Sequence, residues 1–129
     1  NMKRAVVDAS FILSYLLPDE NHPEVDQIIE EHARDICTLI APDILKFEVL
    51  NGLSMVCKRK RVSQVKAFKL ITQFVELDIQ YQDVTEKFIL KAALKYGLSA
   101  YDASYLALAK EKKLKLFSHD RALLRFTQT

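Results

Sequence analysis

Glycine and proline are scarce in this 129-residue sequence, which has only two glycines and three prolines. The scarcity excludes a linker rich in Gly, Pro or Ser, and it leaves no Gly-rich loop that could cradle a phosphate. No internal repeat or low-complexity segment is present. We therefore expect a single domain over residues 1–129, in which Asn1, ahead of Met2, is interpreted as a remnant of cloning.

Cysteine, long apolar runs and charge of one sign are also in short supply. Cys37 and Cys57 are too few for a disulfide framework and form no C-x-x-C pair typical of zinc sites, so we expect two buried thiols. No stretch reaches 18 apolar residues and no signal peptide precedes Ala5, which favours a cytoplasmic protein. The 19 basic and 17 acidic residues nearly cancel, so any affinity for nucleic acid must come from clustered charge.

The sequence does contain a regular alternation of short apolar runs and helical patterns, with 50% hydrophobic residues to build a core. Strands are predicted at 5–7, 37–40, 76–81 and 114–117. Helices are predicted at 11–17, 22–33, 42–58, 63–75, 85–96, 99–112 and 121–126. This alternation predicts an α/β fold with a central, mostly parallel sheet of about four to five strands and helices on both faces.

Four acidic residues lie where a ligand site is expected in such a fold, beyond the carboxyl ends of the strands. Asp8 and Asp120 each end a strand, Asp102 lies in the first turn of a helix, and Glu48 lies one turn inside another. Each has a simpler explanation as a helix cap, a capping-box member with Ser99, or a solvated helix residue. Gathered together, the four would repel one another and need raised pKa values or a cation. Mg²⁺ or Mn²⁺, which prefer oxygen ligands, would suit them.

Four segments together resemble the PIN-domain family in their order and spacing. They are VVDAS at 6–10, the pair Glu48 and Asn51, YDASYLALA at 101–109, and SHDRAL at 118–123. The block at 101–109 is the most specific of these, and the likeness spans essentially the whole chain. It is closest to VapC-type toxins of toxin–antitoxin pairs. The family usually shows Thr where this chain has Ser118, which keeps the hydroxyl.

The resemblance implies that the four carboxylates bind one or two Mg²⁺ or Mn²⁺ ions and hydrolyse RNA endonucleolytically. Ser10, Asn51 and Ser118 would then orient the carboxylates, a role that typically matters about 10- to 100-fold. The resemblance also implies a homodimer and a cognate antitoxin whose C-terminal segment lies in a groove near the site. A catalytically inactive PIN-like module that binds RNA or protein and a structure-specific DNA nuclease remain as alternatives.

Basic and histidine residues near the expected site have two interpretations each. Lys58, Arg59, Lys60 and Arg61 follow a predicted helix, whose C-terminus favours cations, but they could also form a rim that contacts RNA phosphates. His119 could donate a proton or contact a phosphate, or it could be incidental to the neighbouring aspartate.

The apolar residues of the first two predicted helices could exceed what one small core buries, and the excess would then form an interface. The alternative is that they complete the core of the chain itself. The residues concerned are Phe11, Ile12, Tyr15, Leu16, Val25, Ile28 and Ile29.

Overall fold

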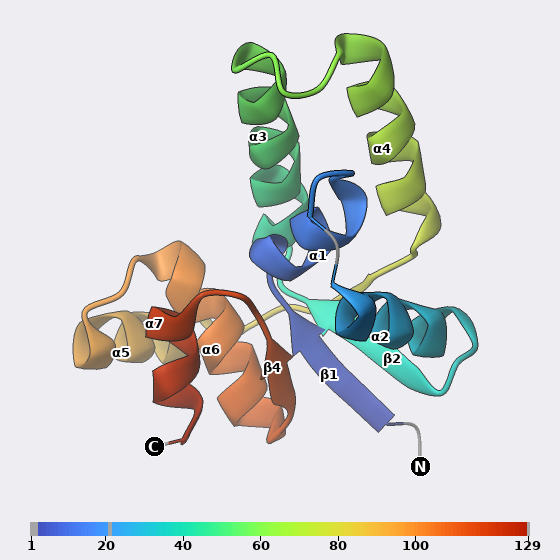
Figure 1. Cartoon of the computed structure of the whole chain (residues 1–129). Coiled ribbons are helices and arrows are strands. Elements are labelled where there is room, and N and C mark those ends of the chain that lie inside the picture. The colour runs from blue at the N-terminus through green and yellow to red at the C-terminus, as the bar shows by residue number, and fades with distance from the viewer. Residues whose placement is uncertain (1–2, 21, 129) are drawn as a thin grey trace.

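The four apolar runs that predict strands pair into one sheet whose neighbouring strands are all parallel. The computed structural model describes residues 3–20 and 22–128, so the interpretation of Asn1 lies outside the described residues. The strands are β1 (Lys3–Val7), β2 (Cys37–Ala41), β3 (Gln80–Tyr81) and β4 (Lys115–Phe117), in the spatial order β3-β2-β1-β4. The predicted α/β class is confirmed (Figure 1).

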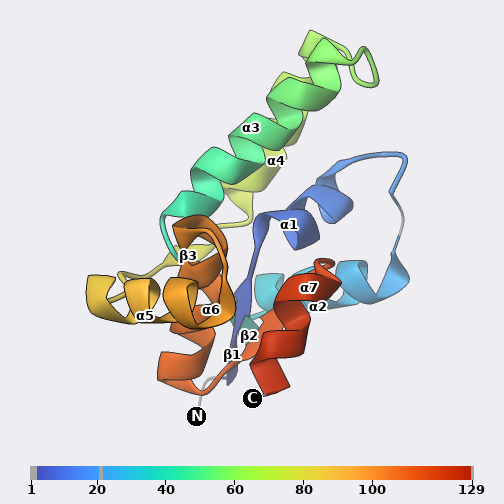
Figure 2. The same ribbon diagram turned by 90° about the vertical axis from the view of Figure 1, so that its left-hand side faces the viewer.

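Helices cover both faces of this sheet, as the alternating pattern predicts. They are α1 (Ala9–Leu16), α2 (Pro23–Ala33), α3 (Ile44–Lys58), α4 (Gln64–Glu76), α5 (Glu86–Tyr96), α6 (Ala100–Lys112) and α7 (Arg121–Leu124), followed by the 3₁₀ turn Arg125–Gln128. In Figure 2 the sheet is seen nearly edge-on, with α5 and α6 on one side and α2 on the other. The antiparallel pair α3 and α4 rises away from the sheet in both views.

The register of β1 and β4 places their carboxyl ends side by side. Val7 is opposite Phe117, and the Asp8 N–H donates to the Phe117 carbonyl at 3.2 Å. The residues that follow both strands therefore meet at one edge, which is where open parallel sheets bind ligands. At the same edge, β2 leads into α3 and so brings Glu48 toward Asp8.

The core is centred on β1 and α6. Ala5, Val6 and Val7 are all buried, which is the pattern of a strand covered on both faces. The run from Ala103 to Ala109 in α6 is buried throughout, so this helix lacks a polar face along most of its length.

The apolar residues of α1 and α2 mostly belong to this same core, which corrects the idea that they are surplus to it. Tyr15 and Ile28 are partly buried and pack against the core. The fully buried members of the set are Phe11, Ile12, Leu16, Val25 and Ile29.

Two local predictions are wrong in part. The strand predicted at 76–81 is limited to Gln80–Tyr81, because α4 continues to Glu76 and Asp78 then turns the chain at a φ of 54°. Cys37 is buried as expected, but Cys57 is only half-buried, with its thiol near the Ser63 carbonyl at 3.7 Å. Among the described residues, no helix is long and apolar enough to cross a membrane.

Candidate active site

Asp8 is the most constrained of the four predicted carboxylates. It is only 6% exposed and caps the N-terminus of α1, where Oδ1 accepts the Phe11 N–H at 3.1 Å. The Ser10 hydroxyl donates to the same oxygen at 2.7 Å, and the Ser118 hydroxyl donates to Oδ2 in a short hydrogen bond. Burial nevertheless raises the pKa of Asp8, because the hydrogen bonds only partly offset the desolvation of its charge.

Ser10 and Ser118 join the ends of β1 and β4 around this carboxylate. Besides its bond to Asp8, Ser118 Oγ accepts the Asp120 N–H at 2.9 Å, and Ser10 Oγ accepts the His119 N–H at 2.9 Å. Asp120 in turn caps α7, accepting the Leu123 N–H at 3.2 Å. Ser10 and Ser118, to which the family resemblance gives an orienting role, thus both donate to Asp8, and the role itself stays a prediction.

Glu48 reaches the site from α3 and is held by a residue that the sequence reasoning missed. The Tyr105 hydroxyl donates to Glu48 Oε1 at 2.6 Å, and the Tyr105 side chain is 1% exposed. Tyr105 lies three residues after Asp102, so both occupy one side of α6. The three-residue spacing from Asp102 is the feature of the sequence that could have pointed to Tyr105, although no local pattern shows that Tyr105 reaches α3.

Gly52 lets α1 approach α3, because a Cβ there would lie 2.5 Å from a Leu13 methyl carbon.

The charges of Asp8, Asp102 and Asp120 raise the pKa values of other predicted carboxylates, which indicates that the four lie near one another. Burial is the main cause that raises the pKa of Asp102, followed by the charges of Asp120 and Asp8. Burial likewise raises the pKa of Glu48; the Tyr105 hydrogen bond opposes this, while the charges of Asp102 and Asp8 add to it. These groups therefore repel one another across a partly desolvated space, which is a condition that a bound cation relieves.

The carboxylate oxygens of this region suit a hard divalent cation, although these side chains do not form a closed set of ligands around one point. In residues 3–20 and 22–128, no three Asp, Glu, His or Cys side chains are gathered tightly enough to hold a metal ion as they stand. Mg²⁺ keeps several waters and commonly uses only one or two carboxylates with the substrate phosphate, so a closed cage is not required. Asp8, Glu48, Asp102 and Asp120 all offer oxygen ligands.

His119 lies beside the site and is held in a stack of rings. Its ring packs against Phe11 at 6.0 Å and against His22 at 4.7 Å between centroids, and its Nε2 lies 2.9 Å from Ser14 Oγ. These contacts give His119 a structural task in fixing the turn that carries Asp120. They tie the chain after β4 to α1 and to the start of α2.

Asn51 and Arg61 contact side chains other than the four predicted carboxylates. The Asn51 side chain is exposed and donates to Met55 Sδ at 3.8 Å rather than to a carboxylate. In the basic run, Arg61 is engaged by Asp19 in a close ion pair and lies 3.9 Å from Glu20. The predicted orienting role of Asn51 and the predicted phosphate rim at residues 58–61 therefore stay predictions.

Comparison with known proteins identifies the family. The PIN domain model matches residues 5–128, and the chain belongs to the PIN-domain family. Ribonuclease VapC3 of Pyrobaculum aerophilum is 30% identical over 124 residues, covering 93% of this chain and 92% of its own length. Ribonuclease VapC9 of Mycobacterium tuberculosis is 30% identical over 118 residues, covering 92% and 87%. The resemblance to VapC-type members is thereby confirmed.

Solved structures of other proteins share the fold. PAE2754 from Pyrobaculum aerophilum superposes with a TM-score of 0.74 at 24% identity, covering 98% of this chain and 87% of its own. VapC20 from Mycobacterium tuberculosis, described as a Sarcin-Ricin loop cleaving toxin, gives a TM-score of 0.62 at 13% identity, covering 95% and 94%. At these identities the likeness establishes the α/β architecture, which agrees with the predicted fold class.

Proposed function

We propose that this protein is a Mg²⁺- or Mn²⁺-dependent endoribonuclease, the toxin of a VapBC-type toxin–antitoxin pair. The observation that carries the proposal is the group of mutually repelling carboxylates at the carboxyl edge of the sheet, with Asp8 buried and held by hydroxyl donors. The names of the relatives, which are VapC ribonucleases, support RNA as the substrate. The catalytic and metal-binding residues would be Asp8, Glu48, Asp102 and Asp120.

The residues of this chain would position the reacting groups rather than react covalently. Ser10 and Ser118 hold both oxygens of Asp8, and Tyr105 holds one oxygen of Glu48, so these carboxylates meet a cation in fixed orientations. When bound, a divalent ion supplies a water nucleophile near neutral pH and neutralises charge on the scissile phosphate. Hydrolysis would leave a 5′-phosphate and a 3′-hydroxyl.

An antitoxin and a second copy of the chain are the partners that this function implies. A groove between α3 and α4 is lined mainly by apolar side chains, including Leu53, Ala67, Phe68 and Ile71. Phe68 is 72% exposed and extends this apolar surface, and contiguous apolar surface is typical of sites that bind a partner. The groove supports a protein partner of the toxin, and dimerisation remains part of the proposal.

The proposal is tested by incubating mixed cellular RNA with the wild type and with Asp102→Asn in Mg²⁺, Mn²⁺ or EDTA. Circular dichroism first establishes that both proteins are folded. Discrete fragments from the wild type alone, abolished by EDTA, are the expected result. Intact RNA under every metal condition would overturn the nuclease function, and RNA binding without cleavage would identify a binding module. Branched and single-stranded DNA substrates run in parallel would reveal a DNA nuclease.

A further inference from the structure

The side of α3 that carries Glu48 continues beyond the carboxylates as a row of exposed side chains. Residues three and four apart lie on one side of a helix, so Glu48, Asn51, Met55 and Arg59 follow one another along α3. Two contacts support this row. The Asn51 amide donates to Met55 Sδ at 3.8 Å, and the Arg59 N–H donates to the Met55 carbonyl at 3.0 Å, which extends the last helical turn to Arg59.

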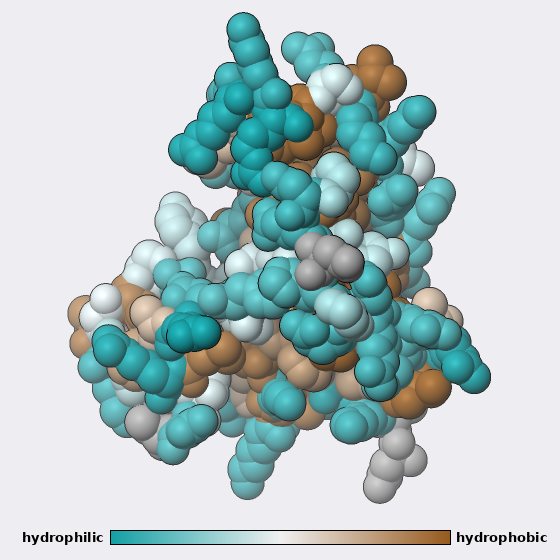
Figure 3. All heavy atoms as spheres, viewed as in Figure 1, coloured by the Kyte–Doolittle hydropathy of each residue, from teal (hydrophilic) through white to brown (hydrophobic). Residues whose placement is uncertain are grey.

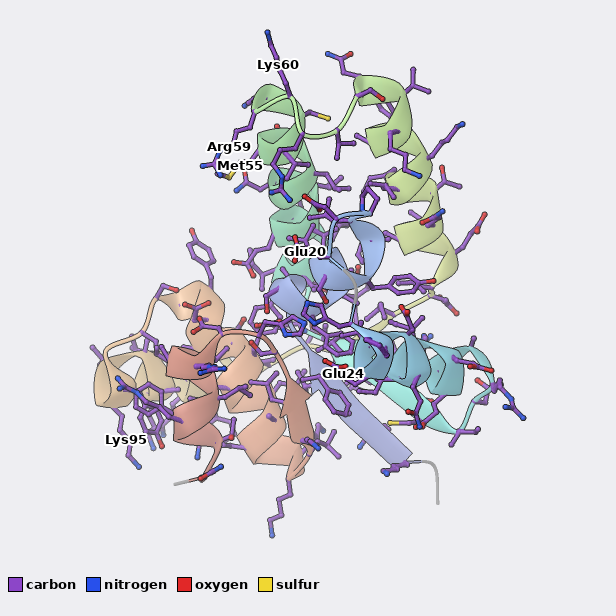
Figure 4. The ribbon with its side chains drawn as sticks, in the orientation of Figure 1. Glu20, Glu24, Met55, Arg59, Lys60 and Lys95 are labelled. Atoms are coloured by element: carbon purple, nitrogen blue, oxygen red, sulfur yellow. The ribbon has the colours of Figure 1, made fainter. Side chains whose placement is uncertain are left out.

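We call Asn51, Met55 and Arg59 the α3 row. Figure 4 labels Met55 and Arg59 side by side on the edge of α3 that faces away from α4. Met55 is 40% exposed, and Asn51 and Arg59 are exposed as well. Figure 3 shows hydrophilic side chains projecting from this upper end of the α3 and α4 pair. The α3 row is therefore open to a ligand along its length.

The structure also separates the four residues of the basic run, which the sequence cannot do. Arg61 is engaged by Asp19 and Glu20, and Lys60 adopts a φ of 59° and projects from the top of the turn in Figure 4. Lys58 is displaced about 100° around the helix from Arg59, since a helix has about 3.6 residues per turn. Only Arg59 in this run lies in line with Glu48.

The spacing suits a nucleic-acid strand that reaches the carboxylates. Arg59 comes eleven positions after Glu48, which is about 16 Å along the helix axis at about 1.5 Å per residue. The Cα–Cβ bonds of a helix tilt toward its N-terminus, which in α3 is the end nearer Glu48. A strand with one phosphate at the carboxylates would present a phosphate a few nucleotides away to Arg59.

We propose that the α3 row is the track for the single-stranded part of the RNA substrate, with Arg59 binding a phosphate. This inference rests on the proposed ribonuclease function. The planar guanidinium pairs with two phosphate oxygens at once, the polarisable Met55 thioether packs against the face of a base, and the Asn51 amide can both donate and accept. Charge complementarity favours this route, because the carboxylates alone repel a phosphate backbone and Arg59 supplies a cation on the side of α3 that carries Glu48.

The test measures binding separately from cleavage. A fluorescein-labelled, mixed-sequence single-stranded RNA is titrated by fluorescence anisotropy in Mg²⁺ with the Asp102→Asn protein, alone and combined with Arg59→Gln. Lys60→Gln is the matched control, because it removes one charge from the neighbouring residue. We expect Arg59→Gln to weaken binding roughly tenfold, as for loss of a hydrogen bond between charged groups. It should also lower the salt dependence by about 0.7 in log–log slope.

Lys60→Gln should change the affinity by less than about twofold, as expected of a charge without a phosphate partner. Equal effects of Arg59→Gln and Lys60→Gln, or no effect of either, would overturn the track. Loss of binding in Met55→Ala but not in Met55→Leu would support the packing of a base on the Met55 side chain. Identical binding by both variants would overturn this packing.

Failure of the track is distinguishable from failure of the proposed function. If the wild type cuts RNA while Arg59→Gln binds it as tightly as its parent, only the track is wrong. If the wild type neither binds nor cuts RNA, the ribonuclease function and the track both fall. Because Arg59 is exposed, circular dichroism of Arg59→Gln should match that of its parent.

Discussion

The carboxyl edge of the sheet and the turn between α3 and α4 are held by opposite kinds of interaction. At the edge, Asp8 is buried and accepts three hydrogen bonds, two from the first turn of α1 and one from Ser118 just after β4. At the turn, Arg61 and Asp19 form an ion pair whose two side chains are 41% and 56% exposed. Buried and fully satisfied groups keep one geometry, whereas exposed ion pairs contribute little and exchange readily with water. We therefore expect catalysis at the carboxyl edge of the sheet, and contacts that adjust to a ligand at the turn between α3 and α4.

The largest expected effect is on activity when Asp8 loses its charge. Asp8→Asn should reduce metal-dependent cleavage by more than about 100-fold, since several kcal/mol of transition-state stabilisation depend on the metal. Stability should change little, because Asn caps a helix about as well as Asp and carries no charge to desolvate, which offsets the loss of the oxygen that accepts the Ser118 hydroxyl. Cleavage rates and metal-free thermal unfolding measure both effects. Asp43→Asn, at the exposed N-cap position of α3, is the control and should remain active. A fully active, folded Asp8→Asn protein would contradict the site.

Removing the hydroxyl that joins Asp8 to Asp120 should have the next largest effect. Ser118→Ala loses the bond to Asp8 and the acceptor for the Asp120 N–H, so we expect activity to fall about 10- to 100-fold. Ser118→Thr keeps the hydroxyl and should retain most activity. Initial rates at saturating Mg²⁺ are the measurement. If the alanine and threonine variants are equally active, the hydroxyl does not orient Asp8.

Tyr105→Phe tests a hydrogen bond that ties α6 to α3 at the site. We expect about a tenfold loss of activity, because Glu48 would lose the donor that fixes Oε1. The loss should lie in kcat and in the Mn²⁺ concentration needed for half-maximal activity rather than in the KM for RNA. Tyr101→Phe removes a hydroxyl from an exposed residue of the same helix and serves as the control. Equal losses in both variants would argue against a positioning role for Tyr105.

A smaller effect is expected from pH and metal on thermal stability. Burial raises the pKa of Asp8, Glu48 and Asp102 above ordinary values of 3.8, 4.5 and 3.8. The native protein therefore binds protons more tightly than the unfolded chain just above these values, and the stability contributed by these groups falls as pH rises through that range. At neutral pH a cation that binds the native carboxylates offsets the loss.

We accordingly expect Mg²⁺ to raise the Tm at about pH 7.5 and to change it little at about pH 4.5, where protons occupy part of the site. Differential scanning calorimetry of the wild type at both pH values is the measurement, with the double variant Asp8→Asn and Asp102→Asn as the control. An equal shift in the control would place the responsible cation elsewhere on the protein.

The sequence predicts the edge of the sheet far better than it predicts the turn. Asp8 and Asp120 were found because a strand end is a local pattern, and Ser10 and Ser118 lie within two residues of them. The Tyr105 bond to Glu48 spans 57 residues, and only the three-dimensional placement of α6 relative to α3 could reveal it. The strand predicted at 76–81 is too long for a similar reason, because the alternation of apolar and polar residues does not show where α4 ends.

The smallest effect is expected at the turn itself, where the four basic residues look equivalent in sequence. Arg61→Ala breaks the exposed pairs with Asp19 and Glu20 and should leave the Tm and the cleavage rate unchanged within error. The measurement is a side-by-side unfolding and cleavage assay with Ser118→Ala, which changes the buried edge. A loss of activity in Arg61→Ala as large as that in Ser118→Ala would mean that the turn holds the site in place as firmly as the strand ends do. The contrast between a rigid catalytic edge and an adaptable turn would then be wrong.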